Sequence, residues 1–364
     1  MNTLSYIIWN ASPDIFTLPI PFLDTKLTLR WYGLLFALGF LISQQILYYI
    51  FKKEGKPEKD VDTLTIYMVI ATVIGARLGH VLFYEPDRYL ANPLDILKIW
   101  EGGLASHGAT VGILFALWLY GRKKKPGQNY LQTLDRIVIL VALTGALIRF
   151  GNFMNSEILG KPTHSNYGIV FARNVTEVLK SDESVQKVSY VQKDSTANAQ
   201  GYQPVRILLE FADGQNTYEE YTQYVEGRVN SYLSYNPYVS EHISQTGYVN
   251  YKVSQDESNK YYAIVNTYAI PRHPAQLYES ISCIILFAFL LWIWIRHKEK
   301  LAEGRLFGIF LIVCFGLRFV YEFLKENQVD FENSLPLNMG QILSIPLVLL
   351  GFYILFRSYR KESK

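Results

Sequence analysis

What this sequence has little of already narrows the class of protein. Only two of its 364 residues are cysteines, Cys283 and Cys314, and both lie within apolar runs. This count argues against a disulfide framework and against a cysteine-based zinc site. Charged residues make up 18% of the chain and the net charge is +3, with the basic residues in small clusters. Nucleic acid is therefore not an expected partner, and the absence of any metal-ligand cluster or nucleotide motif predicts neither a metal nor a cofactor.

A cleavable signal peptide is also missing. The first thirty residues lack a basic leading region and a small-residue cleavage site. Pro13, Pro19 and Pro21 interrupt this segment before a long helix can form. We expect it to lie against a membrane surface and to be retained.

Long apolar runs dominate the rest of the chain. A helix needs about 20 mostly apolar residues to cross a bilayer, and seven segments meet or nearly meet that length. They are residues 29–51, 62–84, 103–121, 133–154, 275–295, 305–324 and 338–356. The sequence thus predicts an all-α polytopic membrane protein with seven transmembrane helices.

The distribution of Lys and Arg predicts the orientation of these helices, because short basic loops stay preferentially on the cytoplasmic side. A basic cluster follows every odd-numbered segment. These clusters are Lys52, Lys53, Lys56 and Lys59; Arg122, Lys123, Lys124 and Lys125; Arg296, Lys298 and Lys300; and Arg357, Arg360, Lys361 and Lys364. The loops at 85–101 and 325–337 carry more acid than base. The N-terminus is therefore predicted outside and the C-terminus in the cytoplasm.

Three portions of the chain follow from this pattern. Residues 1–160 form a membrane portion with four spans, residues 161–272 an inserted small extracytoplasmic head, and residues 273–364 a membrane portion with three spans. An interfacial helix is expected near 88–100, where Leu90, Leu94, Leu97 and Trp100 recur at helical spacing.

The head is expected to be rich in β structure. Short apolar runs occur at 169–171 and 205–211, and Asp213-Gly214 is a hairpin turn signal between the second of these runs and residues 217–225. No internal repeat is apparent, which weakens the case for a transporter built from two halves.

Polar residues inside the apolar segments are the most informative feature. A charged side chain inside hydrocarbon costs about 2.5–3.5 kcal/mol on insertion scales, so it is a functional candidate unless it can reach the interface. With the predicted orientation, these residues all lie at one level in the outer leaflet. They are Tyr32, Arg77, His80, His107, Arg149, Asn152, Asn155, Glu157, Tyr278, Glu279, Arg318, Glu322 and Gln341. The inner halves of the segments carry almost no charge.

Two simpler explanations have to be weighed against a shared site. A single arginine near a helix end often extends to the interface as an anchor, and Arg318 and Glu322, at i and i+4, could pair with each other. Three arginines with histidines and amides at one depth nevertheless favour a common pocket. Guanidinium groups bind phosphate in a bidentate fashion, and a phospholipid headgroup lies at this depth.

The segment 148–160, with the sequence IRFGNFMNSEILG, resembles the signature of the prolipoprotein diacylglyceryl transferase family. Further blocks resemble that family in the same order along the chain. They are RWYG at 30–33, GARLG at 75–79, EGGLASHG at 101–108, RHPAQLYE at 272–279, RFVYE at 318–322 and MGQILS at 339–344. The resemblance covers the whole membrane portion. It departs from the family pattern at Ile148, at Ala105-Ser106 and at Cys314, which stands where some members have a functional tyrosine, and the head is longer than in familiar members.

The resemblance implies a reaction in the bacterial inner membrane. The diacylglyceryl group of phosphatidylglycerol passes to the thiol of the lipobox cysteine in a preprolipoprotein signal peptide, and glycerol phosphate leaves. This is the first step of lipoprotein maturation. Membrane lipids and the signal peptide are the implied partners.

The resemblance also implies roles for individual residues. His107 matches an essential histidine and is the candidate base, although Glu157 competes for that task. Arg149 matches the essential arginine of the signature and is assigned to the phosphate, while Arg318 and Glu322 match a pair that positions the headgroup and gates lipid entry. The residues expected to shape the lipid site are Tyr32, Asn152, Asn155, Glu157 and Gly160. Arg77 and Gln341 are added to the lipid site on depth.

Other functions remain as alternatives. An intramembrane protease would need a serine–histidine pair or paired aspartates in the membrane, and neither pattern appears. An anion-binding or transport protein would use arginines, but would need polar groups continuing to the cytoplasm. A non-catalytic partner in lipoprotein assembly is compatible with the sequence if His107 is inert.

Overall fold

The computed structural model describes residues 6–20, 25–98, 103–193, 196–212, 217–326, 332 and 334–362. The chain divides into two compact units, which are considered separately. Unit 1 comprises Met1–Leu34, Arg149–Tyr278 and Tyr321–Leu335, and unit 2 comprises Leu35–Ile148, Glu279–Val320 and Pro336–Lys364.

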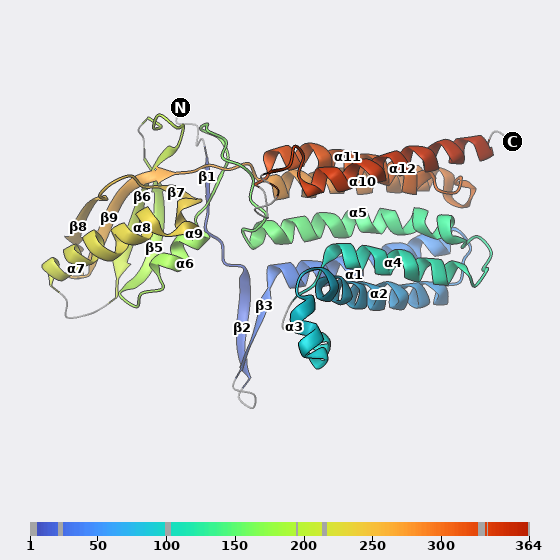
Figure 1. Ribbon diagram of the computed structural model, residues 1–364, viewed down its shortest axis with the longest axis horizontal. Helices are drawn as coiled ribbons and strands as arrows, with labels where there is room; N and C mark the ends of the chain where they lie inside the picture. Colours follow the sequence, from blue (N-terminus) through green and yellow to red (C-terminus); the bar gives the residue numbers. More distant parts are fainter. Residues whose placement is uncertain are drawn as a thin grey trace. The chain divides into compact units, whose positions relative to one another are not determined.

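The chain contains several long helices (Figure 1). They are α1 (Trp31–Lys53), α2 (Lys59–Phe83), α4 (Ser106–Gly121), α5 (Tyr130–Met154), α10 (Ala275–His297), α11 (Arg305–Tyr321) and α12 (Met339–Glu362). Short 3₁₀ turns, η4 (Lys298–Lys300) and η5 (Glu322–Leu324), follow α10 and α11. Within the described residues, six of these seven helices are long and apolar enough to cross a membrane. The other, α4, has 16 residues and falls short of the usual length.

The outer faces of these helices are apolar, as expected of a membrane protein. On α2 the side chains of Ile66, Ile70 and Ile74 are 57%, 52% and 54% exposed. Their spacing of four residues places them in one stripe along the helix. An apolar stripe of this kind would be costly in water and is the surface that a helix presents to lipid.

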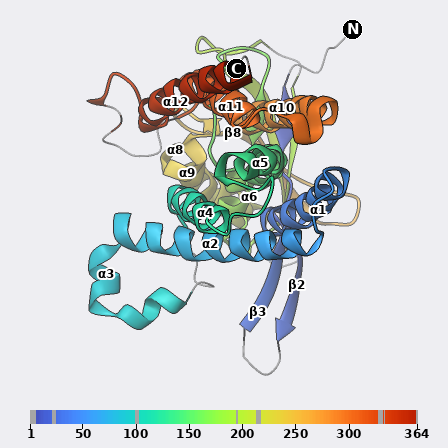
Figure 2. The same cartoon turned by 90° about the vertical axis from the view of Figure 1, so that its right-hand side faces the viewer.

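Helices α2 and α4 pack with their backbones in contact. A Cβ atom added to Gly75 would lie 2.5 Å from the carbonyl oxygen of Gly108, and one added to Gly112 would lie 2.6 Å from that of Ala71. Such an approach requires glycine on both helices. The two helices lie side by side in both views (Figures 1 and 2).

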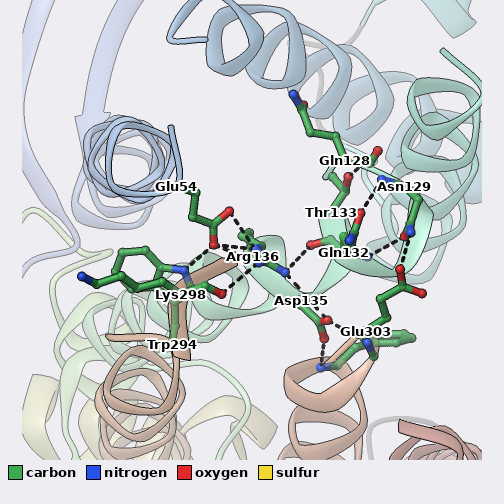
Figure 3. A network of polar contacts seen from close by, with 12 residues as sticks. Glu54, Gln128, Asn129, Gln132, Thr133, Asp135, Arg136, Trp294, Lys298 and Glu303 are labelled. Carbon is green, nitrogen blue, oxygen red and sulfur yellow. Dashed lines mark hydrogen bonds and ion pairs between the residues drawn. The ribbon is translucent and has the colours of Figure 1, made fainter. Parts of the chain in front are cut away.

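A buried polar network joins the helix ends of unit 2 (Figure 3). The Arg136 guanidinium donates to Glu54 Oε1 from Nη2 at 2.8 Å and from Nε at 3.0 Å. Glu54 also accepts from Trp294 Nε1 at 2.7 Å and Lys56 Nζ at 2.6 Å, and its side chain is fully buried. Burial alone would raise the Glu54 pKa, but the charge of Arg136 and these hydrogen bonds outweigh burial and hold the pKa below its usual value.

Asp135, the neighbour of Arg136, caps the start of α11. Its carboxylate accepts from the backbone N–H groups of Gly304 at 2.7 Å and Phe307 at 2.9 Å. The first N–H groups of a helix have no partner within the helix, so a buried helix start needs such an acceptor. Hydrogen bonds and ion pairs thereby join the ends of α1, α5, α10 and α11 in one network.

Unit 1 contains the β structure that the sequence predicted. An antiparallel sheet has the strand order β5 (Val185–Gln192), β6 (Gln203–Phe211), β9 (Tyr261–Ala269) and β7 (Ile243–Ser244), with β8 (Asn250–Gln255) also paired to β9. Two smaller pairs join β1 (Ile7–Trp9) in parallel to β4 (Ile169–Phe171), and β2 (Asp14–Ile20) to β3 (Thr25–Arg30) as a hairpin.

Short helices share a hydrophobic core with this sheet (Figure 1). They are α6 (Arg173–Leu179), α7 (Tyr218–Tyr224), a π-helical turn η3 (Val225–Val229), α8 (Asn230–Tyr235) and α9 (Pro237–Ser240). Ile207 and Leu209 on β6 are fully buried with Val225 and Val229 of the π-helical turn. The alternating residues of β6 supply this face of the sheet, as the period of a strand requires.

The predicted hairpin partner of β6 is wrong, because residues 218–224 form helix α7. The Thr217 hydroxyl accepts from the Glu220 backbone N–H at 3.3 Å, and the Glu220 carboxylate accepts from the Thr217 N–H at 2.7 Å. This reciprocal capping box starts a helix and outweighs the strand preference of the Thr and Tyr residues. The expected turn at Asp213-Gly214 lies outside the described residues.

The expected interfacial helix is two short helices. These are α3 (Pro86–Ala91) and the 3₁₀ helix η1 (Pro93–Leu97), with a break at Asn92, which precedes Pro93. Leu90, Leu94 and Leu97 are 78%, 78% and 70% exposed. Trp100, the last residue of the expected pattern, lies outside the described residues.

Candidate active site

The family-like segment 148–160 begins about two turns before the end of α5 and lies in unit 1 from Arg149 onward. Arg149 Nη1 donates to Asn152 Oδ1 at 3.4 Å, and Asn152 Nδ2 donates to Glu157 Oε1 at 2.7 Å. Asn155 Nδ2 reaches the same carboxylate oxygen at 3.3 Å. The Asn152 amide thus lies between a cation and an anion, with its oxygen toward the guanidinium and its nitrogen toward the carboxylate.

The chain turns sharply after α5. Ser156 and Ile158 adopt positive φ angles of 53° and 57°. This region is sparsely occupied by residues other than glycine, and for a β-branched residue such as Ile158 it is a genuine outlier. The turn brings the Glu157 carboxylate back over the end of α5, and backbone strain of this kind is often found at functional sites.

Two residues that the sequence did not single out hold this turn in place. Arg173 Nη1 donates to the Asn155 carbonyl at 2.6 Å, and Gln276 Nε2 donates to the Glu157 carbonyl at 2.6 Å. Gln276 belongs to the family-like block 272–279 and could have been noted there. Arg173 stands in no motif and gave no signal.

Tyr32 packs against the same end of α5. A Cβ atom added to Gly151 would lie 2.9 Å from Tyr32 Cδ2 and 3.2 Å from Tyr32 Cα. Glycine at this position therefore allows α1 and α5 to approach closely. The charges of Arg149 and Glu157 both act on the Tyr32 hydroxyl.

Gly160 lies where three segments of unit 1 meet. A Cβ atom there would lie 2.1 Å from the His273 carbonyl oxygen. Arg272 Nη1 donates to the Gly160 carbonyl at 2.9 Å and to Glu326 Oε1 at 2.8 Å. Only glycine fits this position, so the predicted role of Gly160 has a steric basis.

Glu322 joins the same region through Lys325. Lys325 Nζ donates to Glu322 Oε1 at 3.0 Å, and both side chains are almost fully buried. The backbone N–H of Lys161 donates to the Leu324 carbonyl at 2.8 Å. Residues 322–325 are therefore hydrogen bonded to the segment that follows Gly160.

A tyrosine–histidine cluster lies beside Gly160, and of its members the sequence analysis named only Tyr278 as a candidate. The Tyr167 hydroxyl is 2.9 Å from His273 Nδ1 and 3.2 Å from the Tyr278 hydroxyl. Burial lowers the pKa of the His273 imidazole, which favours its neutral form. His273 and Tyr278 belong to the block 272–279, but Tyr167 is distant in sequence.

His107 and Arg77 lie in unit 2. His107 is exposed on the first turn of α4, and its ring centroid is 5.1 Å from that of Phe83 and 5.8 Å from that of Tyr84. Arg77 on α2 is only 3% exposed, and its guanidinium lies 4.9 Å from the Tyr89 ring centroid.

Arg77 organises the loop that precedes α4. Its guanidinium donates to the carbonyls of Asp95 at 2.6 Å, Ile96 at 2.8 Å, Lys98 at 3.2 Å and Gly103 at 3.3 Å. The loop is also joined to α2 by the Ala105 N–H, which donates to the Ala76 carbonyl at 2.9 Å. Arg77 thus supports the backbone that leads to His107.

Gln341 and Arg318 are the remaining expected site residues of unit 2. Gln341 Oε1 accepts from the Asn338 N–H at 3.1 Å, and Asn338 Oδ1 accepts from the Gln341 N–H at 2.9 Å, so the pair caps α12 reciprocally. Gln341 Nε2 also lies 3.4 Å from the Phe319 carbonyl, next to Arg318 on α11. Arg318 is half-buried and acts electrostatically on Cys314, one turn earlier.

The expected residues are divided between the two units. Tyr32, Arg149, Asn152, Asn155, Glu157, Gly160 and Glu322 belong to unit 1, and Arg77, His107, Arg318 and Gln341 belong to unit 2. Within unit 2, Arg77 contacts the loop that leads to His107, and Gln341 contacts Phe319 next to Arg318. No group of three or more His, Cys, Asp or Glu residues that could hold a metal ion occurs within the part of the chain that the structure describes.

Comparison with known proteins identifies the family. The model of the family described as prolipoprotein diacylglyceryl transferase matches residues 19–357. Curated proteins named phosphatidylglycerol–prolipoprotein diacylglyceryl transferase are similar over almost their whole length. The protein from Chloroherpeton thalassium is 35% identical over 99% of this chain and 97% of its own, and that from Tolumonas auensis is 34% identical over 98% and 100%. The protein from Bacteroides fragilis is 32% identical over 100% and 99%. The resemblance seen in the sequence is confirmed, and the chain belongs to the prolipoprotein diacylglyceryl transferase family.

Proposed function

We propose that this chain transfers the diacylglyceryl group of phosphatidylglycerol to the lipobox cysteine thiol of a preprolipoprotein, as the first step of bacterial lipoprotein maturation. A carbon–sulfur bond forms at the glyceryl carbon, the bond from that carbon to the phosphate oxygen breaks, and glycerol phosphate leaves. The observation that carries the proposal is the Arg149–Asn152–Glu157 chain on the family-matching segment.

Arg149 is the proposed phosphate ligand. Its contact with the Asn152 amide is at the long limit of a hydrogen bond and involves a neutral acceptor. A phosphate oxygen is a stronger acceptor for a guanidinium, because the bond is then charge-assisted on both sides. Negative charge grows on the phosphate as it leaves, and a positioned arginine stabilises that charge in the transition state.

His107 is the proposed base. A thiol has a pKa of about 8.5 and is a poor nucleophile when protonated, so removal of its proton favours attack. Glu157 is the competing candidate, but its Oε1 already accepts hydrogen bonds from two amides. His107 is exposed at the start of α4, where a thiol could approach it.

The other residues have proposed supporting roles. Tyr32, Asn155 and Gly160 shape the end of α5, and Arg77 supports the loop before His107. Arg318 and Glu322 position the headgroup and control lipid entry, and Gln341 fixes the start of α12 beside Arg318. Phosphatidylglycerol contacts are assigned to Arg149, Tyr32, Arg77, Asn152, Asn155, Glu157, Gly160 and Gln341.

The proposed topology has seven spans, with the N-terminus outside and the C-terminus in the cytoplasm. It includes α4, whose 16 residues extend about 24 Å at 1.5 Å per residue, so the residues before Ser106 would complete the crossing. The three portions are 1–160, 161–272 as the extracytoplasmic head, and 273–364. The basic clusters after alternate helices support this orientation in the inner membrane, with the site in the outer leaflet.

The test is transfer of labelled diacylglyceryl from phosphatidylglycerol to a lipobox peptide by the purified full chain in detergent. Wild type is compared with His107→Gln and with Arg206→Ala, a matched control at an exposed arginine on β6. We expect thioether product from wild type and from Arg206→Ala, and none from His107→Gln. A folded wild type that binds the lipid without forming product would support a non-catalytic lipid-binding protein instead.

A further inference from the structure

The end of α5 is held by an arginine from the segment 161–272. Arg173 is the first residue of α6, and its Nη1 donates to the Asn155 carbonyl at 2.6 Å. Asn155 directly follows Met154, the last residue of α5. Carbonyl groups at the end of a helix have no partner within the helix and carry partial negative charge, so a guanidinium is a suitable donor to them. Arg173 therefore caps the helix that carries Arg149.

Packing and a second hydrogen bond hold Arg173 in this place. The residue before it, Ala172, is fully buried, and its N–H donates to the Trp9 carbonyl at 2.9 Å. The Trp9 ring lies against Phe153 of α5, with 4.4 Å between the ring centroids. Arg173 Nε donates to Glu177 Oε1 at 2.7 Å, and the arginine side chain is only 22% exposed. Both the backbone and the side chain of Arg173 are therefore fixed against the end of α5.

The turn that Arg173 holds carries Glu157 of the family-like segment. Ser156 and Ile158, on either side of it, have positive φ angles of 53° and 57°. Backbone of this kind persists only where the surrounding structure holds it. The Asn155 side chain donates to Glu157 Oε1 at 3.3 Å. Loss of the contact from Arg173 would release the Asn155 backbone, and with it a hydrogen bond that positions the carboxylate.

We propose that Arg173 is a positioning residue for diacylglyceryl transfer, and that it acts through Asn155 on the Glu157 carboxylate. The inference rests on the proposed function, because that function assigns Asn155 and Glu157 to the lipid. It gives the segment 161–272 a part in building the lipid site. A shift of about 1 Å in a substrate-positioning group can lower a rate by about a hundredfold, so the loss of this anchor is measurable.

The first measurement is backbone hydrogen exchange, which needs no activity. The purified full chain in detergent is compared with Arg173→Met, which keeps an apolar stem and loses the donor. Glu177→Gln is the matched control, because it removes only the charge of the other partner of Arg173. The N–H groups of Asn155, Ser156 and Glu157 are hydrogen bonded to carbonyls of α5, so their exchange reports opening of the turn.

We expect faster exchange at these three N–H groups in Arg173→Met, and wild-type rates in Glu177→Gln. Exchange in β6 and β9 should stay unchanged in both variants, which shows that the sheet remains folded. Wild-type exchange at the turn of a folded Arg173→Met would overturn the proposal.

The second measurement is transfer from phosphatidylglycerol to a lipobox peptide by the same proteins. In Arg173→Met we expect kcat/KM for the lipid to fall by about tenfold to a hundredfold, with the KM for the peptide unchanged. Arg173→Lys, which keeps a cationic donor for the Asn155 carbonyl, should recover most of the rate, and Glu177→Gln should match wild type. A higher KM for the peptide with unchanged kcat/KM for the lipid would assign Arg173 to peptide binding and overturn the proposal. If the wild type itself formed no thioether, the proposed function would fail, and the exchange measurement would still decide whether Arg173 holds the turn.

Discussion

Helix α5 carries two arginines whose surroundings differ in kind. Arg136, in unit 2, donates to the buried carboxylate of Glu54 and to the carbonyls of Gln132 and Lys298, and its side chain is 3% exposed. Arg149, thirteen residues later and in unit 1, is half-buried and donates to the amide of Asn152. The first arginine pairs directly with the Glu54 carboxylate, whereas the Asn152 amide contacts both the second arginine and Glu157.

This difference distinguishes an arginine with a structural role from an arginine that can bind a ligand. Removing one partner of a well-formed pair between a buried carboxylate and a buried guanidinium strongly destabilises a protein. Such a pair therefore has a structural role. A phosphate oxygen is a stronger acceptor for a guanidinium than an amide oxygen at 3.4 Å, so Arg149 can exchange its contact with Asn152 for one with an anionic ligand. Substitutions at the first site should therefore affect folding, and those at the second should affect catalysis.

The largest expected effect is at Arg149. Arg149→Ala removes the proposed phosphate ligand and should lower kcat/KM for transfer by at least about a hundredfold, the loss typical of removing one donor to a developing anion. Arg149→Lys should remain poor, because an ammonium cannot supply the planar fork. The measurement is labelled transfer beside thermal unfolding. A large fall in the unfolding temperature of Arg149→Ala would show that Arg149, like Arg136, has a structural role.

The next effect is at Glu54. Glu54→Ala leaves the Arg136 guanidinium buried without its carboxylate and should cost about 3–5 kcal/mol of stability. Transfer per folded molecule should change little. Thermal or denaturant unfolding in detergent measures the loss. Glu299→Ala, at an exposed acid in η4, is the control and should remain within about 0.5 kcal/mol of wild type. Equal stabilities for the two variants would mean that the network contributes nothing.

A smaller effect is expected at Asn152. Asn152→Asp would place a carboxylate beside Arg149 in the position that Glu54 has beside Arg136, and it would also repel Glu157. We expect the KM for phosphatidylglycerol to rise on the order of tenfold, which corresponds to about 1.4 kcal/mol, because the lipid phosphate must displace a charged partner. Asn152→Gln, which keeps the amide, is the control. Unchanged KM in Asn152→Asp would show that the acceptor beside Arg149 is immaterial.

The smallest expected effect is the response of unit 2 to acid. The folded-state pKa of Glu54 lies below its unfolded value of 4.5, so its contribution to stability is present above that value. It is lost as the pH falls through the folded pKa. Wild type should therefore lose stability below about pH 4.5 more steeply than Glu54→Gln. Thermal unfolding from about pH 6 to about pH 3 measures the two stabilities. If wild type and Glu54→Gln lost stability in parallel, groups other than Glu54 would cause the acid response.

Much of the helical framework could be predicted because the signals are local. Apolar runs and basic flanks gave the positions of the long helices, and α4 proved shorter than expected since its helix begins only at Ser106. In unit 1 the runs at 169–171 and 205–211 became β4 and β6, whereas Thr217 and Glu220 form a capping box that makes the next segment a helix. The pairing of β6 with β9 joins residues some sixty positions apart, and no local pattern encodes such a partner.

The site shows the same division between local and distant signals. The sequence grouped Arg149, Asn152 and Glu157 by their depth and by the segment 148–160, and in the structure hydrogen bonds through Asn152 connect them. The groups that hold the turn, Arg173 and Gln276, come from other segments and were not foreseen. Their contribution depends on tertiary packing, which a single sequence without its fold does not reveal.

The glycine seam between α2 and α4 has a mechanical consequence. Helices that touch through interlocking side chains can slide by changing rotamers, but where backbone meets backbone at Gly75, Gly108 and Gly112 there are no rotamers to change. The two helices should then move as one rigid body. Arg77 lies on one helix of this rigid pair and His107 on the other, so any movement of the pair during turnover would leave their position relative to each other unchanged.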